Sequence, residues 1–349
     1  MTHWKDILQK SITTYSALQK HLDCNNTVLE EVIANFPMRI NPYFLNLIKT
    51  PHDPLWKQAV PDPAELADTV CIADPLGEEN LSPVPNLVHR YPDRALFLVT
   101  NQCAMYCRFC TRKRKVGTER MHISDDTIQA GFDYLRKTPA IKDVLISGGD
   151  PLLLDDEVLE KLLFTLRRIP SIEIIRIGTR APCALPMRIT KRLVTILKKF
   201  HPLFINTHFN HPDEITPEAA RACTLLADGG IPLGCQTVLL KGINDDPSVI
   251  LALMRALLRV RVKPYYLFQA DLTRGTNHFR TTTETGIAII RHLIGRVSGM
   301  GIPTFALDAP GGKGKIPLSP DFVLARGKNL VFQSPCGEIC TYPEAGEAF

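Results

Sequence analysis

Three cysteines, Cys103, Cys107 and Cys110, follow one another with the spacing C-x3-C-x2-C. Thiolates bind iron, and three of them on one short loop can hold three irons of a cubane 4Fe-4S cluster. The fourth iron would then lack a protein ligand and could bind a substrate or a cofactor. The spacing therefore predicts an open iron-sulfur site.

Two other interpretations of these cysteines are a structural zinc site and simple core packing. Structural zinc normally takes two paired sets of Cys or His ligands, and no second pair lies close by in the sequence. Free cysteines are commonly buried as small apolar residues. Here, however, the polar residues Asn101, Gln102 and Arg108 flank the cysteines, which does not suit a core segment.

This loop, with the aromatic Phe109 directly before its last cysteine, resembles the cluster-binding loop of the radical S-adenosylmethionine (radical SAM) superfamily. The resemblance implies that the amine and carboxylate of S-adenosylmethionine chelate the fourth iron. An electron from an external reductant such as flavodoxin or ferredoxin would cleave the sulfonium, and a 5'-deoxyadenosyl radical would take a hydrogen atom from the substrate.

Two glycine-containing stretches suggest further ligand contacts. Gly148, Gly149 and Asp150 follow an apolar run, where glycines let the backbone approach a ligand closely, although a tight turn is the alternative. Near the C-terminus, residues 311–315 read Gly-Gly-Lys-Gly-Lys, and Ile316 stands where a Walker A loop requires Ser or Thr. A flexible surface loop and a lysine presented for Schiff-base chemistry both fit this stretch.

Longer stretches resemble the lysine 2,3-aminomutase family, radical SAM enzymes that also use pyridoxal 5'-phosphate. The likeness runs in one register from about residue 70 to about residue 335. The matching stretches are 74–76, 89–94, 103–112, 147–152, 206–212, 265–266, 271, 278–280 and 307–317.

The resemblance implies a pyridoxal phosphate site around Lys315, the catalytic lysine that would form a Schiff base with the cofactor. Arg94 would meet the cofactor phosphate, and Tyr91 would lie beside the cofactor. Lys313 is a second amine nearby. Phe268 stands where the lysine enzymes have Tyr, which removes a hydroxyl from the cofactor's surroundings.

The resemblance also implies the positions that bind S-adenosylmethionine. The turn of Gly148, Gly149 and Asp150 would contact its amino group. His208 and Gln236 would line the same site.

Three charged residues are expected to bind the substrate. Arg112 corresponds to the arginine that clamps the substrate carboxylate, a task that suits the two-pronged guanidinium. Asp271 and Asp308 both follow apolar runs, and two buried carboxylates without a cation between them would repel and raise one pKa. The family's lysine enzymes use such a pair to grip the ε-ammonium, whereas its glutamate enzymes carry other residues. Helix capping is the alternative role for each Asp.

The resemblance therefore implies an isomerase, a lysine 2,3-aminomutase, that moves the α-amino group of L-lysine to the β-carbon to give β-lysine. Within the family, the alternatives are an aminomutase for another amino acid and supply of β-lysine for translation-factor modification. Outside it, the chain could be a radical SAM enzyme acting on RNA or protein through the basic run 112–115, or a zinc-binding module without catalysis.

These residues lie far apart in the sequence, so the fold must bring the loops that carry them to one edge of a sheet. From about residue 90, short apolar runs alternate with amphipathic stretches of helix length, which predicts βαβ units and a parallel sheet. We therefore predict an α/β fold, a partial (β/α)6-type parallel barrel of the radical SAM kind, with its chemistry at the carboxyl ends of the strands. The predicted strands are 95–100, 144–147, 172–178, 203–207, 236–240, 265–269 and 303–307.

Three segments are expected along the chain. Residues 1–75 carry helical apolar spacing and predict a helical N-terminal segment, residues 76–300 the barrel, and residues 301–349 the lysine loop with a short C-terminal extension. In that extension Cys336 and Cys340 alone do not complete a tetrahedral zinc site, so zinc shared between subunits is doubtful and a homo-oligomer stays a possibility.

Composition limits the partners. Of 349 residues, 45% are hydrophobic and 22% charged, and the net charge of +5 is mild, which argues against nucleic acid as a partner. No signal region and no run of about 18 apolar residues is present, which argues against a membrane. With ten scattered cysteines, this predicts a reducing, cytoplasmic setting and a small-molecule substrate.

Overall fold

A computed structural model describes residues 3–22 and 26–345 of the chain. Within these residues, nine strands form one sheet whose spatial order follows the chain from β1 to β9. Strands β2 to β8 are parallel, and β1 and β9 pair antiparallel at the two edges. The strands are β1 Leu87–Tyr91, β2 Arg94–Leu98, β3 Asp143–Ser147, β4 Ile174–Gly178, β5 Leu203–Thr207, β6 Leu233–Leu239, β7 Lys263–Gln269, β8 Thr304–Ala309 and β9 Gly314–Pro317.

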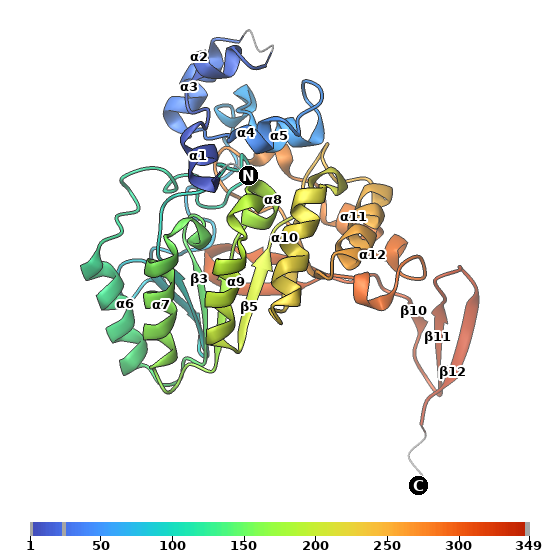
Figure 1. Ribbon diagram of the computed structural model, residues 1–349. Helices are drawn as coiled ribbons and strands as arrows, with labels where there is room; N and C mark the ends of the chain where they lie inside the picture. The colour runs from blue at the N-terminus through green and yellow to red at the C-terminus, as the bar shows by residue number, and fades with distance from the viewer. Residues whose placement is uncertain (1–2, 23–25, 346–349) are drawn as a thin grey trace.

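A helix follows each of the strands β2 to β7, so the described part of the chain contains six βα units before β8. These helices lie along the outside of the sheet (Figure 1). The predicted α/β fold with a parallel, barrel-type sheet is therefore confirmed. No helix in residues 3–22 and 26–345 combines the length and apolar character needed to cross a membrane. The helices are α6 Asp125–Lys137, α7 Asp156–Arg167, α8 Ala181–Ala184, α9 Lys191–Leu197, α10 Pro217–Asp228, α11 Pro247–Arg259 and α12 Thr283–Leu293.

The seven predicted apolar runs all lie on strands, and they differ from those strands mainly at the ends. Strand β6 begins at Leu233 and not at Gln236, because burial already alternates from its first residue. Strand β8 continues to Ala309, because β9 pairs with it from Ala306 onwards. A pattern of apolar residues detects the buried centre of a strand better than its paired ends.

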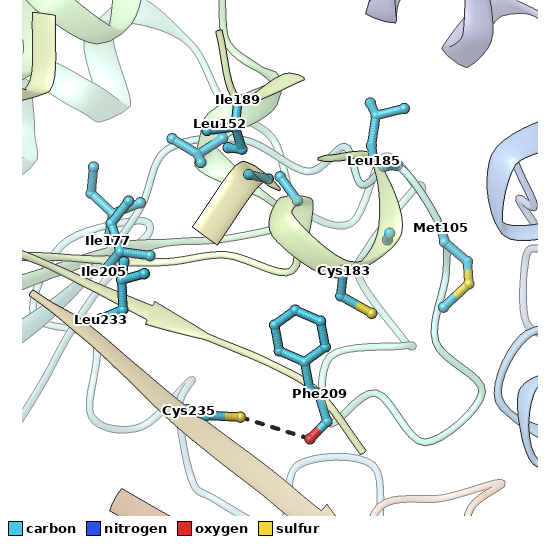
Figure 2. Packing of buried hydrophobic residues seen from close by; sticks show 14 of the residues in the cluster. Met105, Leu152, Ile177, Cys183, Leu185, Ile189, Ile205, Phe209, Leu233 and Cys235 are labelled. Carbon is cyan, nitrogen blue, oxygen red and sulfur yellow. Dashed lines mark hydrogen bonds between the residues drawn. The ribbon is translucent and has the colours of Figure 1, made fainter. Parts of the chain in front are cut away.

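The core lies between the sheet and the helices. Ile177, Ile205 and Leu233, from the adjacent strands β4, β5 and β6, follow one another across the sheet (Figure 2). In the same cluster, the Cys235 thiol donates a hydrogen bond to the Phe209 carbonyl oxygen at 3.7 Å. Cys235 and Cys183 are fully buried, so these two cysteines act as small core residues.

The N-terminal segment is helical, as its apolar spacing predicts. Its helices lie together at one end of the barrel (Figure 1). Trp4, Leu18 and Val32 of this segment belong to the same buried cluster as the strand residues. The boundaries expected near residues 75 and 300 stay predictions, and residues 1, 2 and 346–349 of the outer segments lie outside the described residues. The helices are α1 Trp4–Gln9, α2 Tyr15–Gln19, α3 Val28–Asn35, α4 Pro42–Leu45 and α5 Pro54–Ala59.

A buried ion cluster joins this segment to the cysteine loop. The carboxylate of Glu65 accepts hydrogen bonds from Arg108 at 2.5 Å and from Lys113 at 2.8 Å, and none of the three side chains is more than 5% exposed. Burial would raise the pKa of Glu65, but the charges of Arg108 and Lys113 outweigh burial and lower it below its usual value. The negative charge of Glu65 therefore compensates two buried cations.

A small second sheet ends the described chain. Strands β10 Val323–Ala325, β11 Asn329–Gln333 and β12 Ile339–Pro343 pair antiparallel and project away from the barrel (Figure 1). Cys336 lies in the turn between β11 and β12 and is exposed, whereas Cys340 lies on β12 and is half-buried.

Replacing Glu65 tests the buried ion cluster. We expect Glu65→Gln to lower the free energy of unfolding at neutral pH by about 3–5 kcal/mol, because it leaves two buried cations without their counter-charge. Glu160→Gln, which removes the partner of Lys199 in an exposed pair, should cost at most about 1 kcal/mol. Urea denaturation measures both values.

The pH dependence of the free energy of unfolding also tests whether Glu65 is ionised in the folded protein. The folded-state pKa of Glu65 lies below the unfolded-state value. The contribution of Glu65 to the free energy of unfolding is therefore complete above the unfolded-state pKa. It is lost as the pH falls through the folded-state pKa. Equal stability losses for Glu65→Gln and Glu160→Gln would contradict this role.

Candidate active site

The cysteine loop follows β2 and is held by the N-terminal helices. The backbone N–H of Tyr106 donates to the Arg39 carbonyl oxygen at 3.0 Å, and that of Arg108 donates to the Gln58 carbonyl oxygen at 2.9 Å. The Asn41 side chain donates to the Ala104 carbonyl oxygen at 3.1 Å. The loop has no regular secondary structure of its own, so these contacts fix its shape.

The three cysteine thiols of this loop are free and half-buried. Burial raises the pKa of Cys110 to about 11 and that of Cys103 well above its usual value, so iron would have to displace their protons. The Arg180 guanidinium donates to the Cys107 sulfur at 2.7 Å, a contact that suits a thiolate. Thiols with a cationic donor beside them fit an iron-sulfur cluster.

A single metal ion and a cubane cluster place different demands on the three cysteines. Among residues 3–22 and 26–345, no three Cys, His, Asp or Glu side chains are grouped so that they could hold one metal ion. A cubane cluster instead gives each thiolate its own iron.

The glycine turn after β3 packs directly on the chain that leads into the cysteine loop. A Cβ atom on Gly148 would lie 2.2 Å from the Thr100 carbonyl oxygen, and one on Gly149 would lie 2.2 Å from the Gln102 carbonyl oxygen. The N–H of Gly149 donates to the Thr100 carbonyl oxygen at 2.6 Å. Close approach explains why both positions are glycine. In the structure, however, these glycines approach the backbone of residues 100–102 and not a ligand.

The Asp150 carboxylate is occupied by groups of the protein. It accepts hydrogen bonds from the Thr179 hydroxyl at 2.6 Å and from the Arg180 N–H at 2.8 Å. It also caps the short helix that follows, through the Leu152 N–H. Asp150 therefore ties β3 to the end of β4, and its predicted contact with S-adenosylmethionine stays a prediction.

His208 directly follows β5, and Gln236 lies on the neighbouring strand β6. Burial, together with the charge of Arg180, lowers the pKa of His208 to about 3, so its ring is neutral. That ring lies 6.1 Å from the ring of Phe109 in the cysteine loop. The Gln236 side-chain oxygen accepts a hydrogen bond from the Tyr265 hydroxyl at 3.2 Å. His208 thus lies beside the cysteine loop, and Gln236 is held within the sheet. Their predicted contact with S-adenosylmethionine stays a prediction.

Lys315 lies opposite Asp308 because β8 and β9 pair in that register. The Lys315 ammonium is 3.0 Å from the Asp308 carboxylate and 5.1 Å from the centre of the Phe268 ring. The Lys315 backbone N–H donates to the Tyr91 hydroxyl at 3.1 Å, and the Arg94 guanidinium stacks over the Tyr91 ring at 4.3 Å. The predicted residues around Lys315 are therefore brought together.

Arg90 belongs to this group, although its role was not predicted. Its guanidinium donates to Asp308 at 2.7 Å and to the Leu76 carbonyl oxygen at 3.2 Å. Asp308 therefore has two cationic partners. Arg90 stands next to Tyr91 on β1, which is not among the predicted strands, and nothing in the local sequence indicates which distant carboxylate it contacts.

Asp271 lies just after β7 and close to this group. Burial raises its pKa to about 7, with the charge of Asp308 adding to the effect and those of Lys315 and Arg90 opposing it. The structure describes no hydrogen bond to its carboxylate, whereas Asp308 is already paired. Asp271 is thus a carboxyl group that an additional cation would ionise.

Arg112 is buried against an acidic residue from another segment. Its Nε and Nη2 atoms donate to the Glu78 carboxylate at 2.9 Å and 2.6 Å. Glu78 was not predicted, and the only sequence signal is a pair of acidic residues after Gly77.

The rest of the basic run is also paired. Lys113 contacts Glu65, Arg114 contacts Asp74, and Lys115 contacts Glu79. The run 112–115 therefore does not form the unpaired basic patch that docking of RNA would need.

The sequence can be compared with known families and proteins once this geometry is known. Residues 97–254 match the radical SAM superfamily, and residues 290–349 match the family described as lysine-2,3-aminomutase. Together these two matches include the cysteine loop and the lysine loop.

Relatives match along nearly the whole chain. The L-lysine 2,3-aminomutase of Clostridium subterminale is 47% identical over 98% of this chain and 84% of its own length, and that of Acetoanaerobium sticklandii is 48% identical over the same shares. The glutamate 2,3-aminomutase of Clostridioides difficile is 44% identical over 94% of this chain and 79% of its own length. The chain belongs to the lysine 2,3-aminomutase family of radical SAM enzymes.

Proposed function

We propose that this enzyme is an isomerase that converts L-lysine to β-lysine by moving the α-amino group to the β-carbon. The observation that carries the proposal is the pair Asp271 and Asp308, where one carboxylate already contacts a lysine ammonium and the other has a raised pKa. Such a pair can accept a second ammonium, that of the substrate.

Electrostatics favours lysine over glutamate at this position. The ε-ammonium of lysine would ionise Asp271 and relieve the repulsion from Asp308. The γ-carboxylate of glutamate would instead add a third negative charge. The chain also resembles a glutamate 2,3-aminomutase, but the two aspartates are the stronger indication of the substrate.

Pyridoxal phosphate fits the group around Lys315. Lys315 would hold it covalently, Tyr91 would lie beside it, and Arg94, with a partly exposed guanidinium, would bind its phosphate. Lys313 is exposed on the same loop and has no described partner. When bound, the cofactor would supply a π-system that stabilises the substrate radical.

As a radical SAM enzyme, the chain uses a 4Fe-4S cluster and S-adenosylmethionine, which together supply the radical that removes hydrogen from the substrate. We assign Cys103, Cys107 and Cys110 to the cluster, and His208 and Gln236 to the S-adenosylmethionine site. An external one-electron reductant such as flavodoxin or ferredoxin would complete the system.

Arg112 would bind the substrate carboxylate, at the end of the molecule opposite to the ε-ammonium. The substrate would then be held at both ends, by Arg112 and by the two aspartates. Holding both ends fixes the α- and β-carbons between them, which limits the positions from which hydrogen can be removed.

A product assay tests the proposal directly. We expect anaerobically reconstituted protein, supplied with S-adenosylmethionine, pyridoxal phosphate, dithionite and L-lysine, to form β-lysine that chiral chromatography detects. L-Glutamate under the same conditions should give no β-glutamate. Turnover of glutamate without turnover of lysine would refute the assignment of Asp271 and Asp308 to an ammonium.

Two lysine variants test which amine holds pyridoxal phosphate. Lys315→Ala should lose the visible absorbance of the bound cofactor, whereas Lys313→Ala should keep it, because only Lys315 lies within the group of Tyr91 and Asp308. Borohydride reduction followed by peptide mass spectrometry identifies the attached residue. Attachment to Lys313 in the wild-type protein would contradict the assignment.

The raised pKa of Asp271 predicts how lysine binding depends on pH. Below a pH of about 7 the carboxyl takes up a proton and can no longer pair with the ε-ammonium. Affinity should therefore fall as the pH drops, by about tenfold at one pH unit below this pKa. Asp271→Asn should remove this part of the dependence. Spectral titrations of the bound cofactor with lysine at several pH values give the Kd at each pH. If log Kd changed with pH equally in the wild-type protein and in Asp271→Asn, Asp271 would not be the group responsible.

A further inference from the structure

The Arg112 guanidinium is only partly used by its contact with Glu78. Glu78 takes the edge formed by Nε and Nη2. The structure describes no acceptor for Nη1. A guanidinium carries five N–H groups in a plane, so the edge formed by Nη1 and Nη2 can bind a second carboxylate in the two-pronged manner.

Glu78 is itself held firmly in place. Its side chain is 5% exposed, and it lies on a turn in which the Asp74 carboxylate accepts the Glu79 N–H at 3.0 Å. Gly77 adopts a φ of +63°, and a Cβ atom there would lie 3.2 Å from the Gly311 backbone. The turn that carries Glu78 is thus fixed by its own hydrogen bonds and by contact with the lysine loop.

The same turn contacts the groups that would bind the other end of the substrate. The Gly311 N–H donates to the Pro75 carbonyl oxygen at 2.9 Å. Arg90, which pairs with Asp308, donates to the Leu76 carbonyl oxygen. Residues 74–79 therefore connect Arg112 with Asp308 and with the loop of Lys315.

We propose that Glu78 is a positioning residue that holds Arg112 in the orientation needed to bind the carboxylate of the amino acid substrate. This inference rests on the proposed function, because it takes Arg112 as the carboxylate-binding residue. Glu78 does not compete with the substrate, since it takes one edge of the guanidinium and leaves the other edge free. Without it, the long Arg112 side chain would lose its fixed rotamer, and binding the carboxylate would cost conformational entropy.

The opposite interpretation is that Glu78 occupies the position of the substrate carboxylate and must be displaced. The two interpretations predict changes of opposite sign. If Glu78 positions Arg112, its removal weakens lysine binding. If Glu78 competes, its removal strengthens lysine binding.

The experiment compares Glu78→Gln with the matched variant Glu79→Gln in protein loaded with its cluster and pyridoxal phosphate. Glu79 is the next residue, is largely exposed and pairs with Arg114 and Lys115, so its replacement removes the same charge from the same turn. Spectral titration of the bound cofactor gives the Kd for L-lysine and for 1,5-diaminopentane. The diamine keeps both amino groups of lysine but lacks the carboxylate.

We expect Glu78→Gln to raise the Kd for L-lysine by about tenfold or more, which corresponds to loss of one charge-assisted interaction. The Kd for 1,5-diaminopentane should change far less, because that ligand does not use Arg112 and Glu78 has the smallest effect among the charges that act on Asp271. Glu79→Gln should alter neither Kd. In a double-mutant cycle, Arg112→Lys should weaken lysine binding and Glu78→Gln should add little to it.

Three results would overturn the positioning role: unchanged lysine binding in Glu78→Gln, stronger lysine binding, or an equal loss for lysine and the diamine. Iron content and cofactor absorbance of each variant show whether the fold is kept. Failure of the proposed function would show itself separately, because wild-type protein would then form no β-lysine.

Discussion

The repulsion between two neighbouring carboxylates, Asp271 and Asp308, is the constraint on which the proposed chemistry depends. Burial and mutual charge raise the pKa of Asp271 to about 7, even with Lys315 and Arg90 nearby. Burying a carboxylate pair costs free energy unless cations compensate it. A cationic ligand bound beside the pair would remove part of this cost. The ε-ammonium of lysine is such a ligand.

The other parts of the structure bring two distant loops to this pair. The parallel sheet fixes Asp271 and Asp308 at the ends of adjacent strands, and the β8–β9 register sets Lys315 opposite Asp308. The cysteine loop is held from outside by the N-terminal helices and by the ion cluster of Glu65. The turn at residues 74–79 then contacts both Arg112 and the lysine loop. A radical must form close to its substrate, and this connection fixes the two sites relative to each other.

Apolar runs allowed the fold to be predicted, because they are local signals. The resemblance to the aminomutase family implied that Tyr91 lies near Lys315, whereas the contact between Lys315 and Asp308 follows from the register of β8 and β9. Arg90 and Glu78 could not be found in that way. Arg90 contacts an aspartate 218 positions later, and Glu78 contacts an arginine 34 positions later. Both pairs depend on strand register and loop shape. The ion pairs of the basic run 112–115 have the same cause, since a run of cations does not reveal the carboxylates that fold against it. The small sheet β10–β12 was not predicted either, because its strands are short and largely exposed.

The most direct test of the central claim is to compare the binding of L-lysine and L-norleucine to protein loaded with pyridoxal phosphate. Norleucine has the same α-amino and carboxylate groups and the same carbon chain, but it lacks the ε-ammonium. If Asp271 and Asp308 select an ammonium, norleucine should bind at least about 100-fold more weakly than lysine. Equal affinities would contradict the account, because the aspartate pair would then contribute nothing to the choice of substrate.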